Sequence, residues 1–198
     1  HTLVQCVTYS GHSPFIIPEE SKRISFSDKL PERLRNYMVV ANYTDYAIGQ
    51  FITFLRSQKK FENTMIVITG DHEGFGLTRK PIYEHALGKD IISPERFTPL
   101  IVLNSPVHLR YEKVMGQVDL YPTLLDLLGA DDYPWRGLGE SILSSGKKAF
   151  AISPQMEIIG DTVGVSTAEI QHAKDAWRVS DLIISCDYFA HGRTGDKK

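Results

Sequence analysis

The stretch Met65-Ile66-Val67-Ile68-Thr69-Gly70-Asp71-His72 decides the fold of this chain. Its first five residues, 65–69, form a continuous run that is rich in β-branched and apolar side chains. Such runs are typical of strands that are covered on both faces, as in a parallel sheet. A second run of this kind covers residues 99–103, and a weaker third covers residues 149–152. We therefore expect a strand at each of these three places.

A long helix is expected before the first run. Asp28 suits its N-cap and Pro31 its first turn, and the helical pattern continues to about Ser57. Asp45 falls on the apolar stripe and breaks it, so its carboxylate needs a hydrogen-bonding partner or must reach the edge of the core. The apolar positions follow three- and four-residue spacing: Leu34, Met38, Ala41, Ile48, Ile52 and Leu55.

Further segments complete an alternation of strands and helices. Residues 3–9 are rich in β-formers, and residues 119–128 have helical spacing with Gly129 as a C-terminal stop. Residues 177–189 fit either a helix or a strand. This alternation indicates an α/β fold, with a mainly parallel sheet covered by helices on both faces.

Composition narrows the class of protein. The 198 residues carry a formal net charge of −2, and 42% of them are hydrophobic, as in globular proteins. The near-neutral charge argues against nucleic acid as a partner, and no apolar run is long enough for a transmembrane helix. Because the chain opens without Met directly on an expected strand, we expect residues 1–198 to be one piece of a larger domain. Residues 190–198 form a polar tail that we expect to fray.

Two cysteines are too few for a disulfide framework. Cys6 and Cys186 both lie among apolar residues, where buried free thiols are common. A disulfide between them is the less favoured alternative, and the cysteine count does not decide the cellular compartment.

Asp71 and His72 place a carboxylate and an imidazole just past the carboxyl end of a buried strand. Ligands bind at that edge in open α/β sheets, and Gly70 and Gly74 allow the chain to turn there. Carboxylate oxygen and imidazole nitrogen suit a divalent ion such as Zn²⁺ or Mn²⁺. The alternative is a pair that only caps a loop. Two ligands do not complete a centre, so the other donors must lie far away in the sequence or outside it.

His12 also follows an expected strand. If the two strands are parallel neighbours, His12 lies at the same edge as Asp71 and His72 and can donate to a phosphoryl or sulfuryl oxygen. The alternative is a loop histidine that is exposed by chance. His85 is a weaker candidate on a loop. The remaining histidines are expected on the solvated surface: His108, His172 and His191.

Five motifs in order resemble the sulfatase-like branch of the alkaline phosphatase superfamily. Two of them, residues 10–15 and 95–101, narrow the resemblance to lipoteichoic acid synthase-like proteins, which are phosphoglycerol transferases. The resemblance covers about residues 3–145. The other motifs are the helix segment 41–49, the strand and turn 62–72, and the segment 116–129.

The resemblance implies roles for individual residues. Asp71 and His72 match the metal-ligand pair of the family, which holds one divalent ion, Mn²⁺, Mg²⁺ or Zn²⁺. His12 matches the histidine that binds the phosphoryl group of the substrate. His85 resembles, less closely, a second substrate-binding histidine of related phosphoethanolamine transferases. Asp119 lies in a structural segment and is not expected to be a ligand.

The resemblance also places part of the site outside this chain. The nucleophilic threonine of the family and a further carboxylate ligand lie in an N-terminal half of the same domain, so residues 1–198 correspond to its C-terminal part. Alone, the chain is expected to hold half a site and to be inactive.

The function that the resemblance implies is transfer of phosphoglycerol from a lipid-linked phosphodiester, through a covalent threonine intermediate, to a glycan or polyol acceptor. It further implies an extracytoplasmic domain tethered by upstream membrane helices. One alternative is a sulfatase, acting on a sulfate ester, or a phosphodiesterase of the same superfamily. Another is a noncatalytic domain that binds a glycan or a protein partner.

Overall fold

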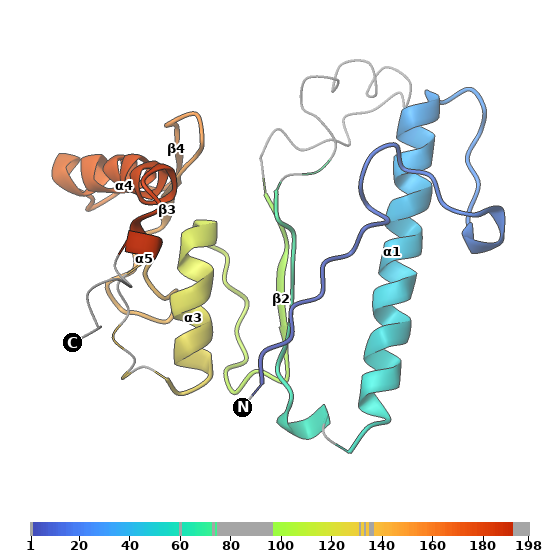
Figure 1. Cartoon of the computed structure of the whole chain (residues 1–198), viewed down its shortest axis with the longest axis horizontal. Coiled ribbons are helices and arrows are strands. Elements are labelled where there is room, and N and C mark those ends of the chain that lie inside the picture. Colours follow the sequence, from blue (N-terminus) through green and yellow to red (C-terminus); the bar gives the residue numbers. More distant parts are fainter. Residues whose placement is uncertain are drawn as a thin grey trace. The chain divides into compact units, whose positions relative to one another are not determined.

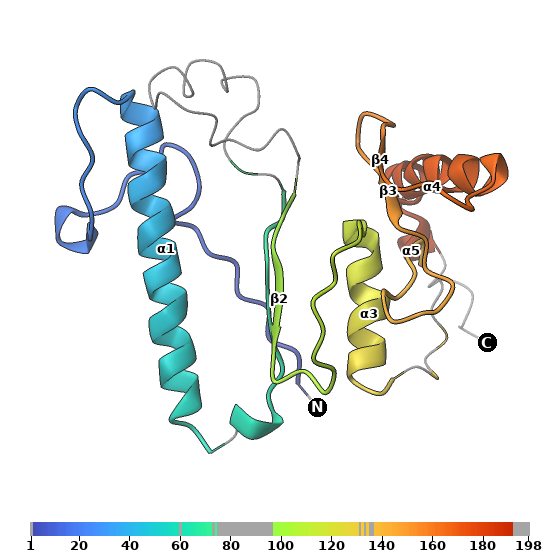
Figure 2. The same ribbon diagram turned by 180° about the vertical axis from the view of Figure 1, so that it is seen from behind.

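The computed structural model describes residues 2–59, 61–72, 74, 97–130, 132, 134 and 137–191. Figures 1 and 2 show the chain from opposite sides. The chain forms two compact units, His1–Asn104 and Ser105–Lys198, which we describe in turn. Within the described ranges, none of the helices has both the length and the apolar character needed to cross a membrane.

Helix α1 (Glu32–Arg56) is the longest element of the first unit and confirms the predicted long helix. It follows a short 3₁₀ helix, η1 (Glu19–Ser21), and begins after Pro31, which occupies the N-cap position. Asp28 does not cap the helix. Its Oδ1 instead accepts a hydrogen bond from Nη1 of Arg35 at 2.5 Å, which ties the preceding loop to the second turn.

The core of the first unit lies between α1 and the segment that precedes it. Phe15 and Ile17 pack against Val39 and Val40 of α1, and all four are buried. Phe26, Tyr37 and Tyr43 pack against this cluster. In Figures 1 and 2 the segment before α1 (blue) crosses to the helix from the side of β2.

The buried face of α1 therefore differs from the predicted stripe. Leu34 is buried as predicted, but Ala41 is exposed, and Val39 and Val40 were not on the stripe. Asp45 is exposed and so needs no buried partner. The reason is that residues 15–17 contact a neighbouring face of the helix, which periodicity alone cannot identify.

The sheet of the first unit consists of β1 (Ile66–Thr69) and β2 (Leu100–Leu103), at two of the predicted places. The strands pair antiparallel, with Ile66 opposite Leu103 and Thr69 opposite Leu100. Asn104, just after β2, donates from Nδ2 to the carbonyl oxygens on either side of the 3₁₀ helix η2 (Phe61–Asn63), those of Phe61 at 2.8 Å and Thr64 at 3.0 Å. The predicted parallel sheet is not confirmed, because the described strands form only antiparallel pairs.

The predicted strand at residues 3–9 is not formed. Leu3 is 90% exposed, and Val4 and Val7 are each 81% exposed. A strand requires a neighbour for its ladder of backbone hydrogen bonds, and within the described residues no strand pairs with this segment. The burial predicted for the two cysteines is also wrong, since Cys6 and Cys186 are free and exposed.

The second unit contains the predicted helix and the third predicted strand. A 3₁₀ turn, η4 (Gln117–Asp119), leads into α3 (Leu120–Leu127), and Gly129 stops the helix with a φ of 67°. Strand β3 (Phe150–Ile152) pairs antiparallel with β4 (Ile158–Gly160).

Two further helices follow in the second unit, α4 (Thr167–Ser185) and α5 (Tyr188–His191). Residues 177–189, which fitted either a helix or a strand, thus form the end of α4 and the first half of α5. Trp177 donates from its indole nitrogen to the carbonyl oxygen of Ile152 at 3.2 Å, which joins α4 to β3.

A buried carboxylate organises the start of α3. Asp119 is 3% exposed. Its Oδ2 accepts from the backbone nitrogen of Gly116 at 2.8 Å and lies 2.9 Å from Nζ of Lys147, while its Oδ1 accepts from the backbone nitrogen of Glu140 at 2.9 Å. These contacts join Asp119 to three separate places in the sequence, so its role is structural.

The charges around Asp119 affect the pKa of Tyr111. Its hydroxyl is buried and has no hydrogen-bond partner among the described residues. Burial raises the pKa of Tyr111 above 10.0, and the carboxylates of Asp119 and Glu140 raise it further. The phenol therefore stays neutral beside the buried negative charge.

We expect Lys147→Met to destabilise the chain by about 3 kcal/mol, because removal of one partner leaves the other charge of a buried pair uncompensated. Urea-induced unfolding measures this free energy. Lys113→Met is the matched control at an exposed position. Equal stability of the two variants would contradict the role of the Asp119–Lys147 pair.

Helix α4 begins with a reciprocal cap. Ser166 accepts at Oγ from the backbone nitrogen of Glu169 at 3.2 Å, and the backbone nitrogen of Ser166 donates to Oε2 of Glu169 at 2.7 Å. The backbone and hydroxyl hydrogen bonds from Ser166 lower the pKa of Glu169 below its usual value, and the charge of Lys148 adds to this. The ionised carboxylate is thus the form that the cap prefers.

A lowered pKa stabilises the folded state above the usual carboxylate range, and this contribution is lost as the pH falls through the lowered value. We therefore expect Glu169→Gln to melt at a lower temperature than the wild type at pH 7. The two melting temperatures should approach each other toward pH 3. Circular dichroism at 222 nm measures both, and a gap that stays constant with pH would contradict the assignment.

Candidate functional site

The first candidate group is the turn that follows β1. Asp71 accepts at Oδ1 from the backbone nitrogen of His72 at 3.0 Å. The same Oδ1 lies 3.8 Å from Nε2 of His72, so the two side chains converge. Both are exposed, the Asp71 side chain at 89% and the His72 side chain at 73%. A ligand from solvent can therefore reach both groups.

The Asp71–His72 pair fits two positions of a divalent metal centre. Zinc bonds to carboxylate oxygen and to imidazole nitrogen of about 2.1 Å place two tetrahedral ligands about 3.4 Å apart. The observed 3.8 Å requires only a small rotation of either side chain. Across the described ranges, no group of three or more His, Cys, Asp and Glu side chains gathers around one point. The pair can thus supply two ligands.

The Gly70 position brings this turn close to the start of β2. A methyl group added at Gly70 would lie 3.3 Å from Cγ2 of Thr98, two residues before β2. This close approach leaves little room for a side chain at residue 70. It also shows how two of the resemblance motifs, the Gly-Asp-His turn and residues 95–101, meet in space.

The second candidate group is the turn that carries His12. The backbone nitrogen of His12 donates to the carbonyl oxygen of Tyr9 at 3.0 Å, and that of Phe15 donates to the carbonyl oxygen of His12 at 3.1 Å. Nδ1 of His12 lies 2.8 Å from the carbonyl oxygen of Ser13. The imidazole stacks on the Tyr9 ring, with 5.9 Å between centroids and 13° between planes. The exposed ring of His12 is thus held by local contacts.

Tyr37 of α1 links the two candidate groups. Its ring meets the ring of Phe15 edge-on, with 5.3 Å between centroids. Its hydroxyl lies against Gly74, because a methyl group added there would be 2.8 Å from that oxygen. Phe15 is three residues after His12, and Gly74 is two residues after His72. Both turns therefore reach the same side chain of α1.

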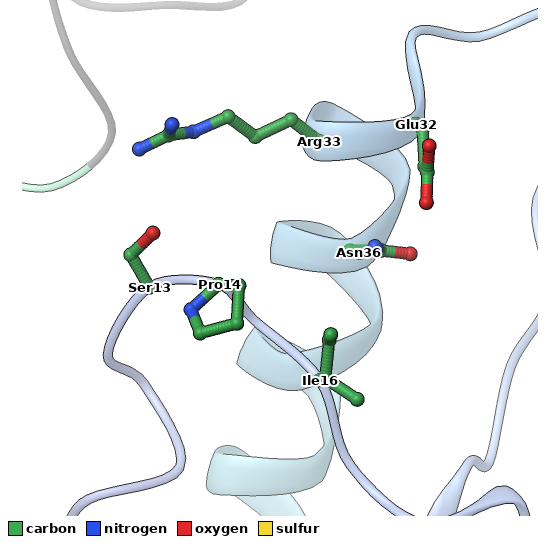
Figure 3. Close-up of a pocket in the computed structure, with 6 residues that line it drawn as sticks. All are labelled: Ser13, Pro14, Ile16, Glu32, Arg33 and Asn36. Carbon is green, nitrogen blue, oxygen red and sulfur yellow. The ribbon is translucent and has the colours of Figure 1, made fainter.

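A cavity of about 240 Å³ lies between α1 and the segment that begins at Ser13, the residue after His12. Figure 3 shows Arg33 extending from α1 on the side where the Ser13 hydroxyl lies, with Asn36 and Glu32 farther along the rim. Arg33 also lies over the Phe15 ring, 5.6 Å from its centroid. One cation, one carboxylate and two neutral polar groups can together bind a ligand with hydroxyl groups and an anionic group. The full lining is Ser13, Pro14, Ile16, Glu32, Arg33 and Asn36.

The predictions for the other histidines have different outcomes. His85 lies outside the described residues, so its proposed role has no structural counterpart here. His108 and His172 are exposed, as predicted. His191 lies at the end of α5, and its side chain is outside the described part of the structure.

Sequence reasoning missed Tyr9, Arg33 and Tyr37 as parts of the candidate site. Tyr37 follows Leu34 by three residues and so lies on the same side of α1, a spacing that could have indicated it. Tyr9 precedes His12 by three residues, the separation that a β-turn brings together. Arg33 gave no signal beyond its place in the first turn of α1.

Helices and strands alternate along the described part of the chain, as they do in α/β proteins. The family model described as Sulfatase matches residues 2–130. The chain belongs to the sulfatase family, and the resemblance noted in its sequence is confirmed.

Two relatives illustrate the similarity. The chain is 32% identical over 155 residues to the lipoteichoic acid synthase-like protein YvgJ of Bacillus subtilis (strain 168), covering 74% of this chain and 25% of the relative. It is 30% identical over 146 residues to the lipoteichoic acid synthase of Staphylococcus aureus (strain USA300), covering 71% of this chain and 22% of the relative. The chain thus spans about a quarter of the length of the curated relatives that it matches.

Proposed function

We propose that this chain is the C-terminal part of the catalytic domain of a metal-dependent phosphoglycerol transferase that acts on a lipid-linked phosphodiester. The similarity to lipoteichoic acid synthases supports this substrate class. The observation that carries the proposal is the contact of Tyr37 with both Phe15 and Gly74, since it brings the turn of His12 and the Asp71–His72 turn to one part of α1.

In this proposal Asp71 and His72 hold one divalent cation, Mn²⁺, Mg²⁺ or Zn²⁺. When bound, such an ion neutralises charge on the transferred group and makes a nearby hydroxyl a better nucleophile. The two side chains contribute an oxygen and a nitrogen that point to one place, 3.8 Å apart. The remaining ligands are proposed to come from the N-terminal half of the domain.

The transfer proceeds in two displacements. A threonine oxygen outside this chain forms a bond to phosphorus, and the bond from phosphorus to the lipid alcohol breaks, which leaves phosphoglycerol on the threonine. The hydroxyl of a glycan or polyol acceptor then forms the new bond to phosphorus and releases the threonine. His12 donates a hydrogen bond to a non-bridging oxygen, which stabilises the charge that develops there.

The cavity lined by Arg33 and Glu32 supports a substrate that is larger than the phosphoryl group. It begins at Ser13, next to His12, and its volume of about 240 Å³ has room for a glycerol group. Glu32 and Asn36 can bind hydroxyl groups, and Arg33 can bind an anionic oxygen. A lipid-linked substrate also favours an extracytoplasmic site beside a membrane, to which upstream helices would tether the domain.

Sulfuric ester hydrolysis is the second candidate, because the matching family model is described as Sulfatase. The groups at positions 12, 71 and 72 would serve either reaction, since phosphoryl and sulfuryl oxygens carry similar charge. Incubation of the full-length protein with phosphatidylglycerol and, separately, with an aryl sulfate distinguishes the two reactions. Release of sulfate without release of lipid alcohol would overturn the transferase proposal.

We expect the 198-residue chain to bind Mn²⁺ weakly, because two ligands leave a centre about two donors short. Isothermal titration calorimetry should show measurable heat that disappears in the double variant Asp71→Ala, His72→Ala. The control is Asp45→Ala, His108→Ala, which removes the same two side-chain types from exposed positions. Tight, stoichiometric Mn²⁺ binding by the chain alone would contradict the proposal that this chain supplies only half of the metal ligands.

We expect His12→Ala in the full-length protein to lower turnover by about 10²–10³-fold, because it removes one charge-stabilising donor. The measurement is the rate of lipid-alcohol release from phosphatidylglycerol at saturating substrate and Mn²⁺. His108→Ala should turn over at the wild-type rate. Normal turnover by His12→Ala would refute the proposed role of His12.

A further inference from the structure

The contact between His12 and Ser13 decides which nitrogen of the imidazole carries a proton. Nδ1 of His12 lies 2.8 Å from the backbone carbonyl oxygen of Ser13. A carbonyl oxygen can only accept a hydrogen bond, so Nδ1 must donate. The neutral imidazole is therefore the Nδ1–H tautomer, and its Nε2 carries a lone pair.

This assignment constrains what His12 can do for a substrate. Nε2 has no hydrogen-bond partner among the described residues, and the ring is exposed, so Nε2 is the atom that meets a ligand. A neutral ring held in this way can only accept at Nε2. Donation to a phosphoryl oxygen requires a second proton, which makes the ring an imidazolium.

The surroundings of the ring keep this geometry in place. The backbone hydrogen bond from His12 to Tyr9 closes the turn, and the Tyr9 ring stacks nearly parallel to the imidazole. Stacking restricts rotation of the imidazole and is favourable for a cation over an aromatic face. Tyr9 contacts the ring, and the charged side chains of Arg33 and Glu32 line the cavity that begins at Ser13.

We infer that His12 acts as an imidazolium, with Nδ1–H on the Ser13 carbonyl and Nε2–H on the anionic oxygen of the substrate, and that Tyr9 is the residue that positions its ring. The activity part of this inference rests on the proposed function. The tautomer part rests on the His12–Ser13 contact alone. The two parts therefore have separate tests.

The tautomer is measured by long-range ¹H–¹⁵N NMR on the ¹⁵N-labelled chain at alkaline pH, where the ring is neutral. His12 signals are assigned by their loss in His12→Gln, and the exposed His172 serves as the internal comparison. We expect a protonated Nδ1 and an unprotonated Nε2 for His12. A protonated Nε2 in the neutral ring would overturn the assignment whatever the protein catalyses.

The charge state is measured by the ratio of wild-type to His12→Gln turnover by the full-length protein between pH 5 and 8. Glutamine can donate without gaining a proton, and the ratio cancels the titration of every other group. We expect a ratio of about ten at pH 5, because a charged donor binds an anionic oxygen more strongly than a neutral amide, and a smaller ratio at pH 8. A constant ratio would overturn the inference, and a rising ratio would make His12 a base instead.

Tyr9 variants test positioning. We expect Tyr9→Ala to lower turnover by about tenfold and to weaken the Nδ1–H signal, and Tyr9→Phe, which keeps the aromatic ring, to restore both. Loss of turnover with an unchanged tautomer in Tyr9→Ala would overturn the positioning role. If the full-length protein transfers no phosphoglycerol at all, the proposed function fails, while the NMR result still decides how the ring is held.

Discussion

The candidate site depends on one contact, the packing of the Tyr37 side chain between Phe15 and Gly74. An aromatic ring on a 25-residue helix is a rigid support, because its position is set by α1 and it has few rotatable bonds. The Tyr37 ring contacts Phe15, three positions after His12, and its hydroxyl lies against Gly74, two positions after His72. Two loops that are far apart in the sequence are thus held against one side chain.

Five elements of the structure could be predicted from the sequence, but the predicted strand at residues 3–9 does not form, β4 was not predicted, and the pairing of the strands did not follow. The strands at 66–69, 100–103 and 150–152 and the helices at 32–56 and 120–127 follow local rules of composition and spacing. The antiparallel pairing of β1 with β2 depends instead on the course of the thirty residues between them. The start of α4 could have been predicted as well, since Ser166 and Glu169 form a capping box eleven residues before Trp177. The apolar run near Leu182, however, also fits a strand.

Part of the candidate site could also be predicted from the sequence. That Asp71 and His72 can act together follows from their adjacency and from the glycine before them. The direction of the His12 ring did not follow from the sequence, because it depends on where the Ser13 carbonyl points and on the stacking with Tyr9. Backbone orientation within a turn is a property of the folded chain. The His12 ring can therefore donate from Nε2 only when it is charged, and this consequence follows from the folded structure rather than from the sequence.

Two aspartates, Asp71 and Asp119, lie in the motifs that resemble the family, and their surroundings differ. Asp119 is almost fully buried, and its two oxygens are occupied by two backbone nitrogens and the Lys147 ammonium. A divalent cation placed there would have to displace an ammonium that already compensates the charge, at the cost of burying that ammonium without its partner. The Asp71 side chain is 89% exposed, and its Oδ1 lies 3.8 Å from Nε2 of His72. The buried ion pair thus argues against a cation at Asp119, whereas the exposed Asp71 is the aspartate to which the proposed function assigns one, although both carboxylates follow a glycine by one to three residues in the sequence.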